Sequence, residues 1–335
     1  MIPADAKGIK LNDQGVCQLC QDYQPFQPKG KDELDRLIKE YLKDNTNPDY
    51  DCVVPISGGR DSSYVLYYSK EVLGLRPVAL HNNNDFETRV AQANLDFITQ
   101  KLGVPLIRIE SKSKLGKKIV VEKFKMNLPF GPGLIASQTC EACKYGFESA
   151  SYNYARKNGI KIIMWGDSSY ESTQPYYDLN EEQQKTPSKW RRLLTRGALS
   201  LFLYRYYFKQ LKNEYGSDSP DNLHEIHLYD FIDWDQDTII NTITEKMGWK
   251  APDESPTTWR VDCCLVPLVD YLTRKEYGVS KIELGFSTMI RNGKMNRDDA
   301  IQKIQQIQSC TSDDQIKKIL SGNLSLPESA YKQLF

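Results

Sequence analysis

Short apolar runs alternate with longer amphipathic stretches through the first half of the chain. The runs at 50–56, 77–80, 104–109 and 161–166 are mostly apolar, which is typical of strands buried in a parallel sheet. Helical spacing of apolar residues predicts helices at 32–42, 64–73, 85–102, 145–157, 297–308 and 313–320. Strands that alternate with helices of this length indicate βαβ units, so the pattern predicts an α/β fold with a doubly wound parallel sheet.

This alternation stops near residue 172, which predicts four parts in the chain. Residues 1–45 would form a small cysteine-containing lobe and a helix, and 46–172 the α/β core. Residues 173–258 are rich in Tyr, Gln and Asn and are predicted to be an insert that meets substrate or a partner; 259–335 would be a helical region that completes the site. Aromatic and basic side chains mix over 190–212. Their periodicity favours a partly buried helix, and a partner or membrane-surface contact is the alternative.

Composition narrows the classes of function. Lys plus Arg and Asp plus Glu both number 44, so the formal net charge is zero, and this disfavours a nucleic-acid partner. The start of the chain has no signal-peptide pattern, and no run approaches the roughly 18 apolar residues of a membrane span. The eight cysteines are far below the density of a disulfide scaffold. We therefore expect a cytoplasmic protein whose cysteines stay reduced.

The segment with the clearest chemistry is SGGRDSS at 57–63, between a predicted strand and a predicted helix. Two glycines allow a tight turn and a close backbone approach to a ligand, and the N–H groups that open a helix favour an anion. Asp61 would act on a magnesium ion or cap the helix. The chain has neither GxxxxGK[ST] nor GxGxxG, and a plain glycine turn with a serine cap is the structural alternative. The predicted phosphate-binding residues are Ser57, Gly58, Gly59, Asp61, Ser62 and Ser63.

With the strand before it, the string YDCVVPISGGRDSS resembles the PP-loop (N-type) ATP pyrophosphatases. The resemblance implies an adenine nucleotide α-hydrolase-like fold. It also implies cleavage of ATP between the α and β phosphates, with transfer of AMP to a carbonyl oxygen of the substrate. The loop residues would then hold pyrophosphate and Mg²⁺. By the same resemblance, the end of the second strand would meet the adenosine, and a Gly-acidic segment would follow the fourth strand. These positions are Leu80, His81 and Asn82, and Gly166 and Asp167 with Glu171 close behind.

Two further segments, GIKLNDQGVCQLC at 8–20 and KIELGFSTMIRNGKMNRDDAI at 281–301, are similar to N-acetyl sugar amidotransferases of bacterial surface-glycan biosynthesis. That resemblance implies conversion of a sugar acetamido group, free or nucleotide-linked, to an acetamidino group. Ammonia would come from a glutaminase-type partner, with a cyclase-like channel subunit in some systems. Arg60, Arg291 and Lys294 would supply positive charge near the phosphates and, with Asp61, form the catalytic set. The sequence is compatible with a homodimer but does not determine the oligomeric state.

The cysteine pairs allow more than one interpretation. Cys17, Cys20, Cys140 and Cys143 together would make a tetrahedral zinc site, although the family usually carries a further CxxC upstream that this chain lacks. PP-loop tRNA thiolases suggest instead an iron–sulfur cluster on Cys140, Cys143 and Cys263 or Cys264. Unliganded thiols are the third interpretation. Cys52 and Cys310 are predicted to lie in the core, and His224 and His227 at the surface.

Two other functions compete with the amidotransferase. A tRNA sulfurtransferase would draw on the six lysines between 112 and 125, but the zero net charge argues against it. A non-catalytic subunit that binds AMP or ATP is the second, because related folds bind nucleotides without chemistry. The retained Gly58, Gly59 and Asp61 argue against that reading.

Overall fold

The computed structural model describes residues 2–110, 114–128, 131–171, 206, 209–253 and 255–335. Its centre is one five-stranded sheet in the order β3-β2-β1-β4-β5, with every neighbouring pair parallel. The strands are β1 (Cys52–Pro55), β2 (Pro77–Asn83), β3 (Leu106–Glu110), β4 (Ile162–Trp165) and β5 (His224–His227). The predicted parallel α/β sheet is confirmed.

The fifth strand lies in a segment where the sequence predicts no strand. Its residues are HEIH, so only Ile226 is apolar and no run of hydrophobic residues marks it. Pairing with β4 in register Ile162↔His224 to Trp165↔His227 defines it. The boundaries proposed at 45, 172 and 258 stay predictions, and most of the aromatic and basic stretch at 190–212 lies outside the described residues.

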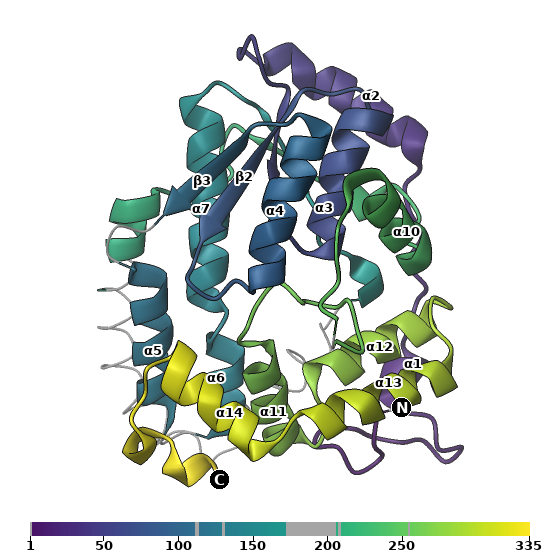
Figure 1. Cartoon of the computed structure of the whole chain (residues 1–335). Helices are drawn as coiled ribbons and strands as arrows, with labels where there is room; N and C mark the ends of the chain where they lie inside the picture. The colour runs from purple at the N-terminus through teal and green to yellow at the C-terminus, as the bar shows by residue number, and fades with distance from the viewer. Residues whose placement is uncertain (1, 111–113, 129–130, 172–205, 207–208, 254) are drawn as a thin grey trace.

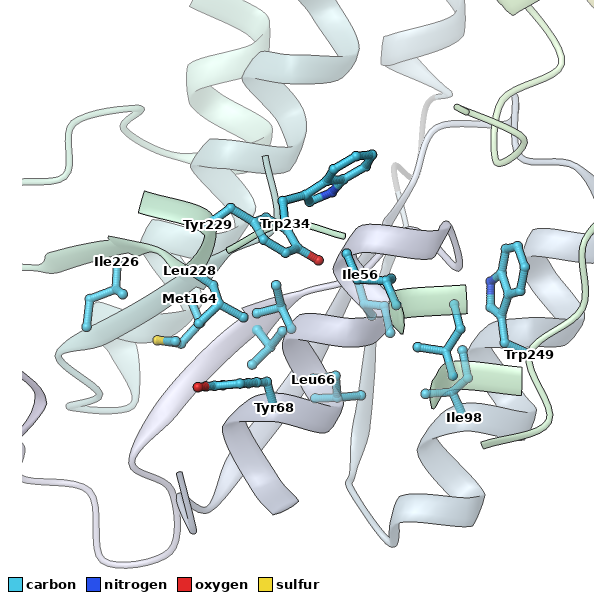
Figure 2. Close-up of a cluster of buried hydrophobic side chains, with 14 of the residues drawn as sticks. Ile56, Leu66, Tyr68, Ile98, Met164, Ile226, Leu228, Tyr229, Trp234 and Trp249 are labelled. Atoms are coloured by element: carbon cyan, nitrogen blue, oxygen red, sulfur yellow. The ribbon is translucent and has the colours of Figure 1, made fainter. Parts of the chain in front are cut away.

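Helices cover both faces of the sheet, because the side chains of β1 divide between two cores. Cys52 and Val54, with Ile56 just after the strand, belong to a cluster with α2, α3, α4 and α10, whereas Val53 belongs to a second cluster with α5, α6, α7 and α11 (Val266–Tyr277). Figure 2 shows part of the first cluster, which includes Trp234 and Trp249. The helices of these two layers are α2 (Lys31–Tyr41), α3 (Arg60–Tyr67), α4 (Arg89–Leu102), α10 (Gln236–Met247), α5 (Leu115–Asn127), α6 (Pro132–Gln138) and α7 (Glu141–Lys157).

Local capping sets where several helices begin. Thr88 accepts a hydrogen bond from the Ala91 N–H at the start of α4, which is why this helix begins later than the predicted 85. Helix α3 begins at Arg60, earlier than the predicted 64, so Ser62 and Ser63 lie in its first turn. The predicted continuation to residue 73 is a π-helical turn at Tyr68–Val72.

The carboxyl-terminal helices lie beneath the carboxyl ends of the strands, at the bottom of the view in Figure 1. They are α11 (Val266–Tyr277), α12 (Lys281–Arg291), α13 (Arg297–Cys310) and α14 (Asp313–Lys318), with the short α1 (Gln18–Gln21) nearby. Backbone hydrogen bonds from Cys264 N to Phe86 O (2.8 Å) and from Thr88 N to Asp262 O (3.0 Å) tie this region to the loop after β2. Among the described residues, no helix combines the length and apolar character needed to cross a bilayer.

Candidate functional site

The turn after β1 follows a path that only glycine permits at its centre. Gly58 has φ +80°, and a Cβ there would lie 2.2 Å from the carbonyl oxygen of Ala91 in α4. The Gly58 carbonyl itself accepts hydrogen bonds from Trp249 Nε1 (3.0 Å) and Asn94 Nδ2 (3.3 Å). The loop is therefore held between α4 and the segment that follows α10.

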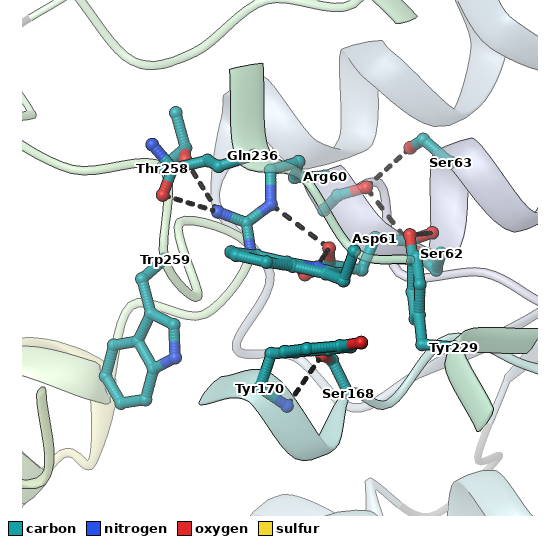
Figure 3. A network of polar contacts seen from close by, with 12 residues as sticks. Arg60, Asp61, Ser62, Ser63, Ser168, Tyr170, Tyr229, Gln236, Thr258 and Trp259 are labelled. Carbon is teal, nitrogen blue, oxygen red and sulfur yellow. Dashed lines mark hydrogen bonds and ion pairs between the residues drawn. The ribbon is translucent and has the colours of Figure 1, made fainter. Parts of the chain in front are cut away.

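The three serines of the loop have different surroundings. The hydroxyls of Ser57 and Ser62 lie 3.3 Å apart, and Ser57 Oγ also accepts from the Gly59 N–H at 3.3 Å. Ser63 is buried and donates to the Gly59 carbonyl at 2.5 Å, so its hydroxyl serves the first turn of α3. Figure 3 shows Ser62 and Ser63 at this turn. The geometry brings two of the three predicted serine hydroxyls together beside the start of a helix, where an anion is favoured.

Arg60 and Asp61 form a pair whose two members differ in exposure. The Arg60 side chain is 1% exposed and Asp61 is 23% exposed. Arg60 donates to both carboxylate oxygens of Asp61, from Nε at 3.1 Å and from Nη2 at 2.8 Å, and its Nη1 donates to Thr258 (Figure 3). Trp234 Nε1 donates to Asp61 Oδ1 at 3.0 Å. Arg60 is thus placed to orient Asp61, and its predicted role as a charge on the phosphates stays a prediction.

A stack of rings and cations extends from this pair to the carboxyl-terminal region. The guanidinium of Arg60 lies 4.9 Å from the centroid of Trp234, which stacks on Tyr170 at 6.2 Å, and Lys294 Nζ lies 5.3 Å from the Tyr170 ring. Asp233 accepts from Lys294 Nζ at 2.6 and 2.7 Å and from the Tyr170 hydroxyl at 3.3 Å. Burial raises the pKa of Tyr170 to about 12, which keeps its hydroxyl a donor.

The stack connects Lys294 with the loop through residues that the sequence analysis missed, and the predicted role of Lys294 near the phosphates stays a prediction. Tyr170, Asp233 and Trp234 were not among the predicted site residues. The only sequence signal was the mixture of aromatic and acidic residues in FIDWD at 231–235, inside the segment interpreted as an insert.

The end of β4 also reaches the loop. A Cβ on Gly166 would lie 3.0 Å from both the Cα and the N of Ser62, so this glycine allows the close approach. The next residue, Asp167, accepts from His227 Nδ1 at 2.7 Å. Burial acts to raise the pKa of Asp167, but the hydrogen bond and charge of His227 outweigh it and lower that pKa. Glu171 ends the 3-10 turn Ser169–Glu171.

At the end of β2, the predicted adenosine-facing residues are largely buried. His81 Nδ1 lies 2.9 Å from the carbonyl oxygen of Ile56, directly before Ser57, and its Nε2 lies 3.5 Å from Glu87 Oε1. Leu80 is fully buried in the second core cluster. Asn82 Oδ1 and Glu87 Oε2 are buried and have no hydrogen-bond partner among the described residues. Glu87 was not predicted, and its acidic loop DFE carried no distinguishing pattern.

Arg291 lies with the amino-terminal lobe. Its Nη1 and Nη2 donate to Ser287 (2.6 Å) and Thr288 (2.9 Å) of its own helix, and its guanidinium lies 5.1 Å from the Tyr23 ring. Its buried Nε has no partner in the described part of the chain. Of the two cations predicted from α12 and the turn after it, Lys294 therefore joins the loop through the aromatic stack, whereas Arg291 contacts the lobe.

The two cysteine pairs have different neighbours. Cys20 interacts with Cys17 and with Arg291. Cys140 directly precedes α7 without a side-chain capping hydrogen bond, and Cys143 lies in the first turn of this helix. Burial raises the pKa of Cys143, with smaller contributions from Cys140, Glu87 and Cys264, and burial likewise raises the pKa of Cys263, next to Cys143 and Cys140. The cysteines that neighbour one another are Cys140, Cys143, Cys263 and Cys264.

Neither metal interpretation finds a preformed site. In the described ranges, no three His, Cys, Asp or Glu side chains are arranged so that they could hold a metal ion. Cys17, Cys20, Cys140 and Cys143 therefore do not form an assembled donor set for zinc in that same part of the chain. Cys52 is buried, as predicted, but the prediction that Cys310 lies in the core is wrong, because this residue is exposed at the end of α13.

Comparison with known proteins yields distant likenesses. No protein-family model matches the chain. An uncharacterised protein of Methanocaldococcus jannaschii is 28% identical over 141 residues, which are 42% of this chain and 44% of that protein. The match thus spans less than half of the relative's length.

Solved structures with some similarity include the NMN synthetase from Francisella tularensis, with 15% identity and a TM-score of 0.38 over 88% of this chain and 97% of that one. A U34-tRNA thiolase from Methanococcus maripaludis with its [4Fe-4S] cluster has 14% identity and a TM-score of 0.37 over 88% and 90% of the two chains. The NAD⁺ synthetase from Burkholderia pseudomallei has 16% identity and a TM-score of 0.35 over 85% and 89%. Likenesses at this level assign neither an activity nor a substrate to the chain.

Proposed function

We propose that this chain is an ATP-dependent, AMP- and pyrophosphate-forming amidotransferase that acts on an N-acetyl sugar. The observation that carries the proposal is the loop at 57–63. It forms a glycine turn with φ +80° at Gly58, presents two converging serine hydroxyls, and opens α3 at the carboxyl edge of a parallel sheet. This edge is where open α/β sheets bind their ligands, and the start of a helix favours phosphate.

The loop supplies the parts that nucleotide cleavage requires. Main-chain N–H groups at the start of α3 and the hydroxyls of Ser57 and Ser62 would bind the departing pyrophosphate. Oxygen ligands suit Mg²⁺, and the partly exposed carboxylate of Asp61 with the hydroxyl of Ser62 would hold that ion. When bound, Mg²⁺ would neutralise charge on the phosphates. Arg60 would keep the Asp61 carboxylate oriented toward it.

The proposed reaction has two steps. The acetamido oxygen attacks the α-phosphorus and an O–P bond forms. The bond between the α-phosphorus and the bridging oxygen breaks, and its electron pair leaves with pyrophosphate. Ammonia then attacks the acetamido carbon, the C–O bond to AMP breaks, and an acetamidino group remains. Adenylylation is needed because the oxygen of an amide is a poor leaving group. The segments at 8–20 and 281–301 support the choice of an acetamido sugar, and a glutaminase partner would supply the ammonia.

The test is AMP release from ATP with a panel of N-acetyl sugars and sugar nucleotides, with ammonium chloride as the nitrogen source. We expect stoichiometric AMP, pyrophosphate and acetamidino sugar. The matched control is the same sugar with a free amine, which lacks the carbonyl oxygen and should release no AMP. Glutamine should replace ammonium only after the partner subunit is added. AMP release that requires tRNA, or none with any acetamido sugar, would contradict the proposal.

A tRNA thiolase is the second candidate, and a specific observation favours it. Cys140 contributes to the raised pKa of both Cys143 and Cys263, and Cys143 contributes to that of Cys263, so the three thiols that a cluster would use lie in one neighbourhood. Metal analysis with an absorbance spectrum of anaerobically purified protein separates the two. A brown protein with iron and sulfide, which loses its colour in Cys143→Ser but not in Cys20→Ser, supports the thiolase. A colourless protein without iron contradicts it.

A further inference from the structure

Three histidines occur in the chain, and the structure gives them different surroundings. His81 is buried, with Nδ1 at the Ile56 carbonyl and Nε2 facing Glu87. His224 stacks on Tyr41 at 3.8 Å, at the amino end of β5. His227 ends β5, at the carboxyl edge where the loop at 57–63 lies, and its side chain is 39% exposed. Only His227 combines an exposed ring with a position at this edge.

The hydrogen bond to Asp167 decides which ring nitrogen of His227 is available. Nδ1 lies 2.7 Å from Asp167 Oδ1, and a carboxylate can only accept, so Nδ1 carries the proton. Nε2 then has the lone pair, and it has no hydrogen-bond partner among the described residues. A carboxylate that holds an imidazole in one tautomer and stabilises its protonated form is the arrangement that makes histidine a general base.

Both sides of this pair are anchored to the nucleotide loop. Gly166, directly before Asp167, packs against Ser62. Tyr229, two residues after His227, donates from its hydroxyl to the Asp61 carbonyl at 3.4 Å. His227 lies opposite Trp165 in the register of β4 and β5. The pair is therefore part of the same edge as the proposed phosphate site, on the side formed by β4 and β5.

We propose that His227 is the general base of the nitrogen-transfer step, positioned by Asp167. This inference rests on the proposed function and deepens it. When ammonia adds to the adenylylated acetamido carbon, a C–N bond forms and the nitrogen becomes positively charged. His227 Nε2 accepts one proton from it. The C–O bond then breaks, its electron pair leaves with AMP, and the acetamidinium product remains.

The charges around His227 determine the direction of its titration. The hydrogen bond to Asp167 raises the pKa of His227, burial opposes this, and the charges of Asp167, Asp230 and Glu225 add to the rise. The charge of Lys144 in α7 acts on Asp167 and lowers the pKa of that carboxyl. Because the neutral ring is the base, activity per unit of free NH₃ should rise with pH through the pKa of His227. Asp167→Asn removes the main cause of the rise, so this limb should move to lower pH.

The experiment separates the two steps of the reaction. In His227→Gln we expect sugar-dependent exchange of pyrophosphate into ATP, which reports adenylylation alone, within about threefold of wild type. Acetamidino sugar formation, per unit of free NH₃, should fall by about 100-fold or more, and its acid limb should disappear. His224→Gln, at the other end of the same strand, is the matched control and should change neither rate. Product formation within threefold of wild type, or an unchanged acid limb, in His227→Gln would overturn the assignment.

A second measurement needs no substrate, so it distinguishes this inference from the proposed function. NMR titration of the three imidazole rings should show that the pKa of His227 falls in Asp167→Asn. An unchanged His227 pKa overturns the pairing itself. Absence of sugar-dependent exchange in the wild type would instead contradict the proposed function, and the general-base role would fail with it even if the pairing is observed.

Discussion

Gly58 and Arg60, two residues apart, constrain the same loop in different ways. Gly58 is required by sterics, because its backbone is left-handed and the Ala91 carbonyl occupies the space of a Cβ. Arg60 acts through its charge, because a nearly buried guanidinium must be paired with a carboxylate, here that of Asp61. The first constraint sets the path of the backbone, and the second sets the direction of the Asp61 carboxylate.

Gly58→Ala should damage both stability and nucleotide binding. The left-handed conformation alone costs an alanine about 1–2 kcal/mol, and the contact with Ala91 requires the loop or α4 to move. Urea unfolding should show a loss above about 2 kcal/mol, and ATP binding by calorimetry should be abolished. The matched control is Gly248→Ala, at φ +71° with nothing within 4 Å, which should lose only the backbone cost of about 1–2 kcal/mol and bind ATP normally. Equal losses in both variants would contradict the role of the Ala91 contact.

Asp61→Asn should lower the free energy of unfolding as well as activity. The substitution leaves the guanidinium of Arg60 without its counter-charge, and breaking a buried pair costs about 3–5 kcal/mol. Because Asp61 is partly exposed, we expect about 2–3 kcal/mol, together with loss of AMP formation. Asp96→Asn breaks the exposed pair with Arg108 and should cost at most about 1 kcal/mol. A fully stable Asp61→Asn protein would show that Arg60 does not need this carboxylate and that its hydrogen bonds to Gln236 and Thr258 are sufficient.

At the scale of elements, helix starts and strand edges bring distant residues to one place. The turn between α11 and α12 is an example, because Ser280 and Glu283 form a capping box that fixes the start of α12. Asp270 of α11 accepts from the Ile282 N–H at 3.3 Å, which joins the two helices. Burial raises the pKa of Asp270 to about 7, although the Ile282 N–H and the charge of Lys281 oppose the rise.

This carboxyl should make stability depend on pH. The folded-state pKa lies above the unfolded value of 3.8, so the protonated form is favoured by folding. The contribution of Asp270 to the free energy of unfolding is fully present below about pH 4. It is lost as the pH rises through about 7. Asp270→Asn, which keeps the acceptor, should therefore gain stability over wild type between pH 5 and 8. We expect the free energy of unfolding, measured with urea, to increase by about 2 kcal/mol. This is about half of the free energy that a pKa shift of this size represents for a fully buried group. A difference between the two proteins that does not change with pH would contradict this.

At the scale of the whole molecule, two hydrophobic clusters join segments that are far apart in sequence. The second contains Val53 and Val78 of the sheet together with Leu320 and Leu334 near the carboxyl terminus. Salt bridges and backbone contacts also join distant segments. One example is the salt bridge of 2.7 Å between Lys7, near the amino terminus, and Glu276 of α11. The carboxyl-terminal helices cannot separate from the sheet without exposing part of its core.

Unfolding should consequently be one cooperative transition. Tryptophan fluorescence reports five tryptophans, among them Trp234 and Trp249 in the first cluster and Trp165 in the second. It should change at the same urea concentration as the far-ultraviolet circular dichroism of all helices. Leu320→Ala, in the second cluster, should move both curves together by about 2–5 kcal/mol. Two separate transitions would indicate that the carboxyl-terminal region is an independent unit.

The sequence by itself determined the parallel α/β sheet and the glycine turn at 57–63, because these follow from local sterics and from short apolar runs. It could not identify β5, since HEIH becomes a strand only beside β4, nor the pairing of Arg60 with Asp61. The stack through Trp234 and Tyr170, the division of the cysteines into two neighbourhoods, and the contact of His227 with Asp167 were decided by tertiary structure. Asp167 and His227 are 60 positions apart, and Asp61 and Trp234 are 173 positions apart. Only the crossovers of the folded chain bring such residues within contact distance.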